Sequence, residues 1–237
     1  MSRFERTKLL IGKEKLDILR KKKVAVFGLG GVGGYACEAL ARSGVGELHL
    51  IDNDIVDETN INRQIIALKS TIGRDKVDVM KERIFDIGDD IRVFTYKVFL
   101  TSDNIDILPF DKFDYVVDAI DTISAKVALI EKAEGNNTPI ISAMGTGNKL
   151  YAEKLKIADI YDTKVCPLAK TIRTELKKRD IKKLKVVYSE ELPKNEISDE
   201  EKTDNYKNHK RVISSISYVP AVAGLLMAEE VIKDLIV

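Results

Sequence analysis

The chain has 237 residues, and its 39 Lys and Arg residues against 38 Asp and Glu leave a formal net charge of +1. This balance provides no overall field that would draw the protein to nucleic acid or to a membrane surface. A hydrophobic content of 44% is sufficient for one large α/β domain, with two small domains as the alternative. The two cysteines, Cys37 and Cys166, lie too far apart to indicate a zinc ribbon or a disulfide framework.

Strands and helices are expected to alternate along the first two thirds of the chain. Short β-rich runs alternate with longer segments of helical pattern, an order typical of parallel βαβ units. The sequence therefore predicts a Rossmann-type, doubly wound, mostly parallel sheet. The expected strands are 23–28, 48–52, 92–98, 115–119 and 139–143, and the expected helices are 32–43, 73–87 and 122–134.

The pattern changes after Ala143. We expect a loop at 144–148, a strand at 154–160, a basic helix at 167–179 and a mobile polar loop near 190–210. The apolar run that follows predicts a strand at 213–219 and a core helix at 220–236, with Pro220 in its first turn. The whole chain, 1–237, is expected to be one domain, with a nucleotide-binding core (1–143) and a carboxy-terminal α/β extension on the substrate side (144–237), packed on the same core.

No membrane span is expected. The apolar run near 212–226 contains serines and Pro220 and is shorter than the roughly 20 apolar residues that a spanning helix needs. The charged segment 1–15 has no apolar stretch of the signal-peptide type. A reduced, cytoplasmic setting is therefore expected.

The segment from Gly28 to Gly33 matches the pattern G-x-G-x-x-G between a strand and a helix. Glycines in this position let the backbone approach phosphates, and the amino end of the helix favours their charge. Gly28, Gly30, Gly31 and Gly33 therefore predict a nucleotide site, a merely structural turn being the alternative. Asp52 ends the next strand, where an acid commonly binds ribose hydroxyls.

Two cations follow this acid in segments that could return to the cleft, Arg63 and Lys76. Arg can grip phosphate oxygens with its planar fork, and Lys supplies a point charge. Their presence favours a triphosphate over a dinucleotide. Taken singly, however, each could be a solvated surface cation.

These pieces together resemble the ubiquitin-activating-enzyme-like superfamily, which includes the ThiF, MoeB and HesA proteins. The resemblance covers about residues 3–142. The matching segments are Arg3–Arg6, Gly28–Gly33, Asp52–Asp54, Asn60–Gln64, Lys76 and Asp118–Asp121.

The resemblance implies a site for ATP and Mg²⁺ and an activity that adenylates a carboxylate. Asp52 would then hold the ribose, Arg63 and Lys76 the phosphates, and Asp121 the metal. Without the resemblance, the alternative for Asp121 is a helix N-cap before Ile123. Further residues at the nucleotide would be Asp54, Asn60 and Gln64. Arg6 would reach the phosphates of a neighbouring subunit, which implies a homodimer and makes Arg6, Arg63, Lys76 and Asp121 the expected catalytic set.

The closest resemblance is to the tRNA threonylcarbamoyladenosine dehydratase branch of this superfamily. The chain lacks the four cysteines with which many carrier-protein activators bind zinc, so no zinc is expected. The features that are similar to this branch are Asp118–Thr122, Lys126–Ile130 and Pro167–Lys170. The branch implies a tRNA partner and ATP-dependent ring closure on the modified adenosine, with sulfur-relay proteins as possible further partners.

The basic helix gives separate support for a tRNA partner. Lys170, Arg173, Lys177 and Lys178 would share one face, where they could follow phosphates or simply be solvated. Two other functions remain open. A sulfur-carrier or ubiquitin-like-protein adenylyltransferase would use Cys166 as an acyl acceptor, although a neutral packing role for Cys166 is the alternative. A dinucleotide-dependent oxidoreductase would leave Arg6, Arg63 and Lys76 without roles.

Overall fold

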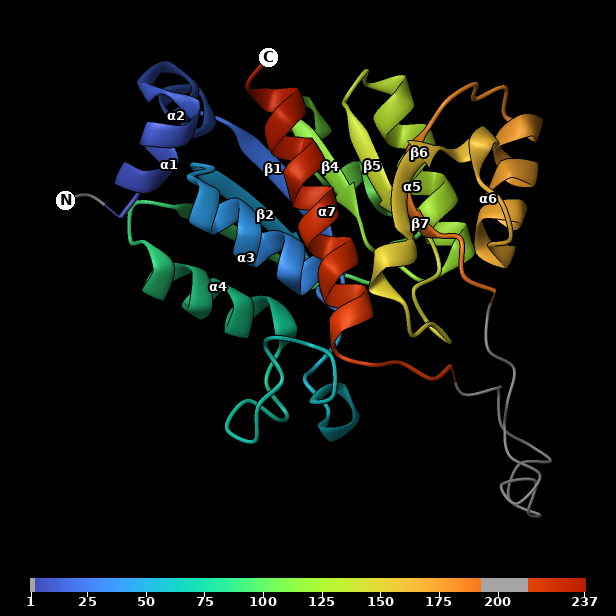
Figure 1. The fold of residues 1–237 in the computed structure, drawn as a ribbon, viewed down its shortest axis with the longest axis horizontal. Coiled ribbons are helices and arrows are strands. Elements are labelled where there is room, and N and C mark those ends of the chain that lie inside the picture. Colours follow the sequence, from blue (N-terminus) through green and yellow to red (C-terminus); the bar gives the residue numbers. More distant parts are fainter. Residues whose placement is uncertain (1–2, 193–212) are drawn as a thin grey trace.

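A seven-stranded sheet runs through the centre of the computed structural model, which describes residues 3–192 and 213–237 (Figure 1). Its strand order is β3-β2-β1-β4-β5-β7-β6. Every neighbouring pair is parallel except β6 and β7, which are antiparallel. The strands are β1 (Lys23–Phe27), β2 (Glu47–Ile51), β3 (Arg92–Tyr96), β4 (Tyr115–Asp118), β5 (Ile140–Ala143), β6 (Leu155–Asp159) and β7 (Lys185–Ser189).

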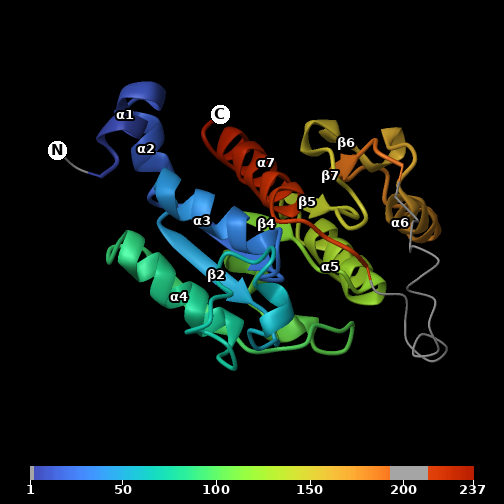
Figure 2. The same cartoon turned by 60° about the horizontal axis from the view of Figure 1, so that its bottom comes forward.

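Helices cover both faces of this sheet (Figure 2). One face packs against α3 (Gly33–Ser43), α4 (Lys76–Ile87) and α7 (Tyr218–Leu235). The other packs against α5 (Ile123–Gly135), which in turn packs against α6 (Pro167–Lys178). The expected doubly wound α/β fold is therefore confirmed. Two short helices, α1 (Glu5–Ile11) and α2 (Lys13–Leu19), precede β1, and 3-10 turns lie at Glu58–Asn60, Ile105–Ile107, Phe110–Lys112, Ala152–Lys154 and Ile160–Asp162.

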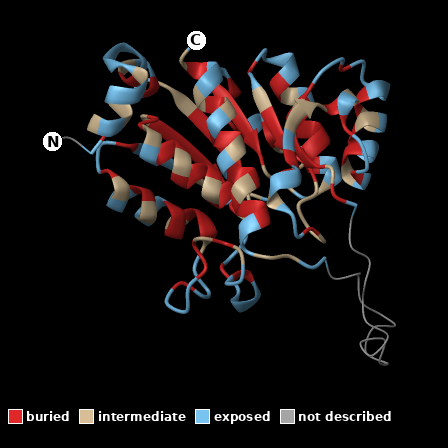
Figure 3. Cartoon of the chain, viewed as in Figure 1, coloured by how far each residue is buried: buried red, intermediate tan, exposed pale blue. Residues whose placement is uncertain are grey.

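The core lies where the sheet meets these helices, as the buried ribbon in Figure 3 shows. In β1, Val24 and Val26 face α3 and α7, while Ala25 and Phe27 face α5. The side chains alternate between faces, and both faces are covered, so the strand is apolar at every one of these positions.

Helix α7 approaches α3 at backbone distance. A β-carbon on Gly224 of α7 would lie 2.2 Å from the carbonyl oxygen of Val32. Pro220 in the first turn of α7 lies against the glycine loop, 3.2 Å from where a β-carbon on Gly31 would be. The carboxy-terminal helix is therefore part of the core that supports the amino-terminal half of the sheet.

One expected strand is wrong. Residues 213–216 form no strand, and α7 already begins at Tyr218. The strand beside β5 is β7, which the sequence did not predict. Ile213 is 69% exposed. Helices α1 and α2 were also not predicted.

The loop expected near 190–210 lies almost wholly outside the described residues. Within the part of the chain that is described, no helix is both long and apolar enough to cross a lipid bilayer.

Candidate nucleotide site at the carboxyl edge of the sheet

The predicted glycine loop follows β1 and rests on the end of β4. Gly28 has a φ of +86°, and a β-carbon there would lie 2.7 Å from the carbonyl oxygen of Ala119. A β-carbon on Gly33 would lie only 1.8 Å from the carbonyl oxygen of Gly28. Both positions therefore require glycine, one for its conformation and close contact, the other for contact alone. The loop opens into α3 at the point where the strand order reverses, between β1 and β4.

Asp52 lies beside this loop at the end of β2. Its carboxylate accepts hydrogen bonds from the backbone N–H of Leu29 at 2.6 Å and of Asp54 at 2.8 Å. Burial raises the pKa of Asp52, and these two hydrogen bonds oppose the rise. These bonds hold the Asp52 carboxylate against the glycine loop. Its role in binding the ribose stays a prediction.

Lys76 is the first residue of α4, and it is buried although it is a lysine, with 4% of its surface exposed. Its Nζ donates to Asp54 Oδ2 at 2.8 Å, and its backbone N–H donates to the carbonyl of Asp54 at 3.0 Å. The Asp54 side chain is 59% exposed. The amine is therefore held at the boundary between the core and solvent, on the segment that follows β2.

Arg63 and Gln64 come from the segment that follows the 3-10 turn Glu58–Asn60. The Arg63 Nη1 donates to the carbonyl of Thr59 at 3.0 Å and to Asn62 Oδ1 at 2.9 Å. Its Cγ lies 3.4 Å from where a β-carbon on Gly31 would be, so this cation borders the glycine loop.

Gln64 is buried, and the Gln64 Oε1 is the only buried side-chain nitrogen or oxygen without a hydrogen-bond partner among the described residues. Its Nε2 lies 3.8 Å from where a β-carbon on Gly30 would be. Buried polar groups normally have partners. An amide with spare hydrogen-bonding capacity beside a glycine loop fits a polar ligand at that place.

Asn60 has a local role in the structure. Its Oδ1 accepts from the backbone N–H of Asp57 at 3.2 Å, which completes a capping box around the 3-10 turn. This bond holds the segment that carries Arg63 and Gln64. The direct contact to nucleotide expected for Asn60 stays a prediction.

Asp121 is exposed on the loop between β4 and α5. The N-cap of α5 is Thr122, not Asp121, and the Asp121 Oδ1 receives only a long 3.4 Å contact from the Thr122 hydroxyl. Among the described residues no three His, Cys, Asp or Glu side chains gather as a metal site. A single exposed carboxylate nevertheless suits Mg²⁺, which binds proteins through one or two carboxylates and keeps waters and substrate phosphates as its other ligands.

A short segment, residues 213–217, crosses the same edge of the sheet, and we call it the strap. Asn148, with a φ of 57°, accepts from the Ser214 N–H at 2.9 Å and donates its own N–H to the Ser214 carbonyl at 2.8 Å. At the other end, the Asn62 Nδ2 donates to the Ser215 carbonyl at 3.1 Å. The strap therefore joins the loop after β5 to the segment that carries Arg63.

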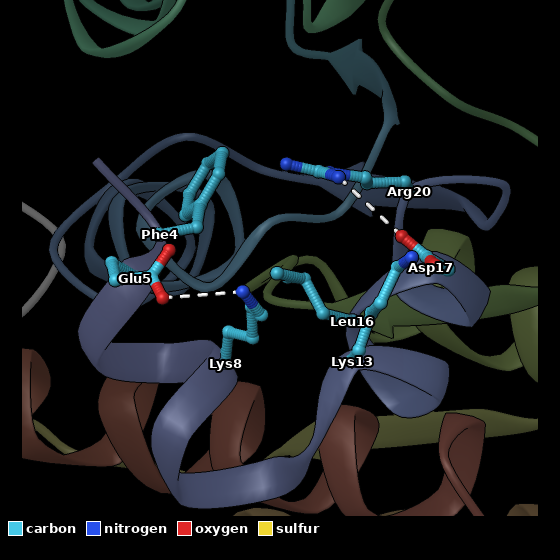
Figure 4. Close-up of a pocket in the computed structure, with 7 residues that line it drawn as sticks. All are labelled: Phe4, Glu5, Lys8, Lys13, Leu16, Asp17 and Arg20. Carbon is cyan, nitrogen blue, oxygen red and sulfur yellow. Dashed lines mark hydrogen bonds and ion pairs between the residues drawn. The ribbon is translucent and has the colours of Figure 1, made fainter. Parts of the chain in front are cut away.

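Arg6 is exposed on α1, at the opposite end of the strands from the glycine loop (Figure 1). The hydrogen bond from the Gly46 N–H to the Leu19 carbonyl, 3.1 Å long, ties the end of α2 to the start of β2. Figure 4 shows the hollow between α1 and α2, lined by Phe4, Leu16 and charged side chains, and it is separate from the nucleotide site. Within one chain, the structure does not bring Arg6 to the other predicted site residues.

The four predicted tRNA-contacting cations on α6 differ in their surroundings. The Arg173 Nη1 donates to the carbonyls of Ile160 at 3.2 Å and Thr163 at 3.1 Å, so this guanidinium supports the preceding turn. Lys178 pairs with Glu175 at 2.6 Å. Lys170 and Lys177 are exposed, and Lys177 also lies 6.0 Å from the centre of the Tyr161 ring.

Both cysteines are buried. Cys37 lies in α3 and has a raised pKa, chiefly because of burial. Cys166 precedes α6 and is 4% exposed. Its sulfur lies 3.9 Å from where a β-carbon on Gly145 would be, in the loop after β5.

Sequence reasoning missed a buried polar cluster directly under the site. Lys126 of α5 forms an ion pair with Asp118, and both are completely buried. Asp118 and Lys126 both lie in segments of the family resemblance, but the signal for their pairing is only a lysine in the apolar run of α5, between Ala125 and Val127.

The fold and this edge of the sheet define a Rossmann-type nucleotide-binding protein with a cation, Arg63, beside its glycine loop. More narrowly, the chain belongs to the ThiF family, whose model matches residues 4–236. The family expected from the sequence is thus confirmed.

Among curated proteins, the chain is 44% identical over 242 residues to tRNA threonylcarbamoyladenosine dehydratase of Bacillus subtilis (strain 168), across 100% of this chain and 95% of the relative. It is 39% identical to the Escherichia coli (strain K12) protein of that name, across 74% of this chain and 65% of the relative. A more distant relative is adenylyltransferase and sulfurtransferase MOCS3 of Culex quinquefasciatus, 33% identical across 60% of this chain and 33% of the relative.

Among solved structures, the chain is similar to E. coli tRNA N6-threonylcarbamoyladenosine dehydratase in complex with AMP, with a TM-score of 0.89 and 33% identity, over 98% of this chain and 93% of that one. The complex of that enzyme with ATP gives a TM-score of 0.87 and 32% identity, with the same shares covered.

Proposed function

We propose that this protein is an ATP-dependent tRNA threonylcarbamoyladenosine dehydratase. The observation that carries this proposal is the likeness, along nearly the whole of both chains, to the B. subtilis and E. coli dehydratases, the second of which is solved with ATP and with AMP. The relatives that activate carrier proteins match over a smaller part of the chain. ATP is therefore the nucleotide and tRNA the substrate.

The reaction begins at the carboxylate of the threonyl group. A carboxylate is a poor electrophile because its oxygen would have to leave as oxide. One carboxylate oxygen attacks the α-phosphorus of ATP, the bond to pyrophosphate breaks, and the carboxylate becomes an acyl adenylate. A nucleophile within the modified nucleoside then attacks the acyl carbon and closes the ring. The nucleophile gives up its proton and AMP leaves with the former carboxylate oxygen, so the modified nucleoside loses the elements of water.

The residues at the carboxyl edge have separate tasks in the adenylation step. The glycine loop lets the nucleotide approach the backbone, and Asp52 is placed beside it for the ribose. Arg63 borders the loop, Lys76 is held by Asp54 on the segment after β2, and both cations stabilise the charge that develops on the phosphates. Gln64, with its unpaired amide oxygen, faces the same region.

Asp121 suits Mg²⁺ at the phosphates. The metal would withdraw charge from the phosphate oxygens during attack. Arg6 would supply a further cation from a second subunit, because its own helix lies at the far end of the strands. The proposal therefore includes a homodimer, and we place the protein in the cytoplasm, with sulfur-relay proteins as possible partners.

The rival function is an adenylyltransferase for a sulfur-carrier or ubiquitin-like protein, with Cys166 as the acyl acceptor. Incubation with ATP and either threonylcarbamoyladenosine-containing tRNA or a carrier that ends in Gly-Gly separates the two. Mass spectrometry of the digested tRNA should show loss of one water from the modified nucleoside. A carrier adenylate or thioester with unchanged tRNA would overturn the proposal.

Nucleotide choice is tested separately by calorimetry. ATP with Mg²⁺ should bind in preference to NAD because Arg63 lies beside the glycine loop and Lys76 is held on the segment after β2 by Asp54. Tight binding of NAD without binding of ATP would instead support the dinucleotide-dependent oxidoreductase.

A further inference from the structure

A buried ionic cluster lies beneath the loops that form the nucleotide site. The Lys126 Nζ donates to Asp118 Oδ2 at 2.7 Å, to Ser142 Oγ at 3.1 Å and to the carbonyl of Ala143 at 3.0 Å. An ammonium group has three N–H donors, so all of its hydrogen-bonding capacity is used. The side chains of Lys126 and Asp118 are both 0% exposed.

Both carboxylate oxygens of Asp118 also accept hydrogen bonds. Its Oδ2 also accepts from the Ser142 hydroxyl at 2.5 Å, and its Oδ1 accepts from the backbone N–H of Ile120 at 3.1 Å. The second of these bonds turns the chain immediately after β4. Asp118 therefore shapes the loop that carries Asp121 three residues later.

The position of this cluster relates it to the phosphates. Asp118 is aligned with Phe27 at the end of β1 and with Ser142 in β5. The next residue, Ala119, donates its N–H to the Phe27 carbonyl at 2.8 Å, and its carbonyl oxygen is the atom that a β-carbon on Gly28 would meet. Ala119 therefore meets the glycine loop through backbone contacts of its own, whereas Asp118 and Lys126 hold the loops after β4 and β5.

Stability alone gives no reason for an ion pair in this place. Removal of two charges from water carries a desolvation cost that their attraction only partly offsets, and apolar residues of similar volume often serve as well. What the pair does supply is a fixed geometry, because one ammonium group holds atoms of β4 and of β5 together. The cluster lies where two strands end and their loops diverge.

We propose that Lys126 is a positioning residue of the nucleotide site. Through Asp118 and the Ala143 carbonyl it holds the loops after β4 and β5 in the arrangement that presents Asp121 to the metal-bound polyphosphate. This inference rests on the proposed use of ATP. Lys126 would not contact the nucleotide itself but would fix the position of Asp121, which is proposed to bind its metal.

The proposal separates two parts of the nucleotide. The glycine loop and Asp52 belong to β1 and β2, and they retain their own hydrogen bonds without Lys126. The polyphosphate and its Mg²⁺ depend on Asp121. Loss of the cluster should therefore weaken binding of ATP with Mg²⁺ much more than binding of AMP.

The test uses the double variant Lys126→Met/Asp118→Asn, which removes both charges and leaves neither unpaired. Calorimetry should show at least a tenfold increase in the Kd of ATP with Mg²⁺ and less than a threefold change in the Kd of AMP. The control is Lys132→Met on the same helix, where the lysine is partly exposed and pairs with Asp106 at 2.6 Å. The control variant should bind both nucleotides as the unaltered protein does.

A merely structural role would lower the melting temperature and change both affinities by the same factor. That result, or two unchanged affinities in the folded double variant, would overturn the proposal. If the double variant does not fold, Ser142→Ala decides, since it removes one hydroxyl of the cluster and should weaken ATP binding at least threefold. An unchanged ATP affinity in Ser142→Ala would then overturn the proposal that the cluster positions Asp121. These measurements need no tRNA. A failure of this proposal can therefore be distinguished from a failure of the protein to dehydrate tRNA.

Discussion

At the residue scale, the burial of Cys166 argues against a covalent role, because a buried thiol has little access to a substrate. The thiol is 4% exposed, between the loop after β5 and the start of α6. If the ring closes within the substrate, Cys166→Ser should retain most of the dehydration turnover. Removal of a covalent nucleophile would instead cost on the order of a thousandfold or more. A loss on that scale, with an unchanged melting temperature, would favour the carrier-activating function.

His49 connects the stability of the protein to pH. Burial lowers the pKa of His49 below its usual 6.5, although its hydrogen bond to Glu47 opposes this, and the ring also stacks on Phe94. A folded-state pKa below the unfolded value means that the unfolded chain takes up the proton more readily. The free energy of unfolding should therefore fall as the pH falls below about 6.5.

The measurement is urea-induced unfolding at pH values between 7.5 and 5.5, for the protein and for His49→Gln. The variant should lose less stability over this interval, since Gln takes up no proton. Equal losses in the two proteins would show that another group causes the pH dependence. The pKa of Glu47 is also lowered, against its burial, by its bonds to His49 and Arg92, and this contribution has the same sign at more acidic pH.

Residues that act through the backbone were easier to recognise from the sequence than residues that act through long side chains. Gly28 and Gly33 are required by contacts that follow from a local turn, so their spacing was sufficient. Arg173 was expected on the surface, yet its guanidinium holds the carbonyls of Ile160 and Thr163. A side chain as long as arginine can extend into solvent or fold back onto nearby carbonyls, and the sequence does not show which of the two it does.

Helix α6 is the element with which tRNA binding can be tested. Lys170 and Lys177 are exposed, whereas Arg173 supports a turn and Lys178 is paired with Glu175. The variant Lys170→Ala/Lys177→Ala should weaken tRNA binding and flatten the log–log salt slope by about two, because each lost phosphate contact changes that slope by about one.

Binding isotherms at several salt concentrations provide the measurement for α6. Lys178→Ala is the matched control, and its slope should change by less because its charge is already partly balanced. If the slope of the double variant matches that of the unaltered protein, α6 does not belong to the RNA surface.

Helices and strands were predicted well where the local hydrophobic pattern determines them. They were predicted poorly where pairing with distant strands of the sheet determines them. The helices at α3, α5 and α6 and the strands β1 to β5 lie within a few residues of their expected bounds. The strand expected at 213–219 is absent, whereas β7, which was not predicted, pairs with β5, and such pairing is a property of the assembled sheet. In its place the chain forms the strap, whose bonds to Asn148 and Asn62 are made by side chains distant in sequence.

At the scale of the whole molecule, the proposed homodimer would place α1 against the site of a second copy. No residue of α1 is buried, and Leu9 and Leu10 are 80% and 85% exposed. Arg6 lies on this helix, far from the glycine loop of its own chain. A cation supplied across an interface would act as an arginine finger does in other phosphoryl-transfer enzymes.

Complementation tests this arrangement. Arg6→Ala and Lys76→Ala should each be nearly inactive alone. In a mixed dimer, one site has both residues intact and the other has both defects. Random exchange of subunits should therefore restore up to about a quarter of the original activity, since half of the dimers are mixed and each has one working site. Confirmed exchange without recovered activity would show that Arg6 does not act across the interface.

The packing of α7 on α3 has a consequence for the order in which the protein can mature during synthesis. The amino-terminal half emerges first from the ribosome, but the side of α3 that packs on α7, where Gly224 meets Val32, stays uncovered until α7 is made. Until α7 has been made, that half exposes apolar surface, the condition in which partly folded chains aggregate. The nucleotide loop, which rests on Pro220, therefore reaches its final support only when translation has passed α7, so ribosome-bound chains that end before α7 should depend on chaperones.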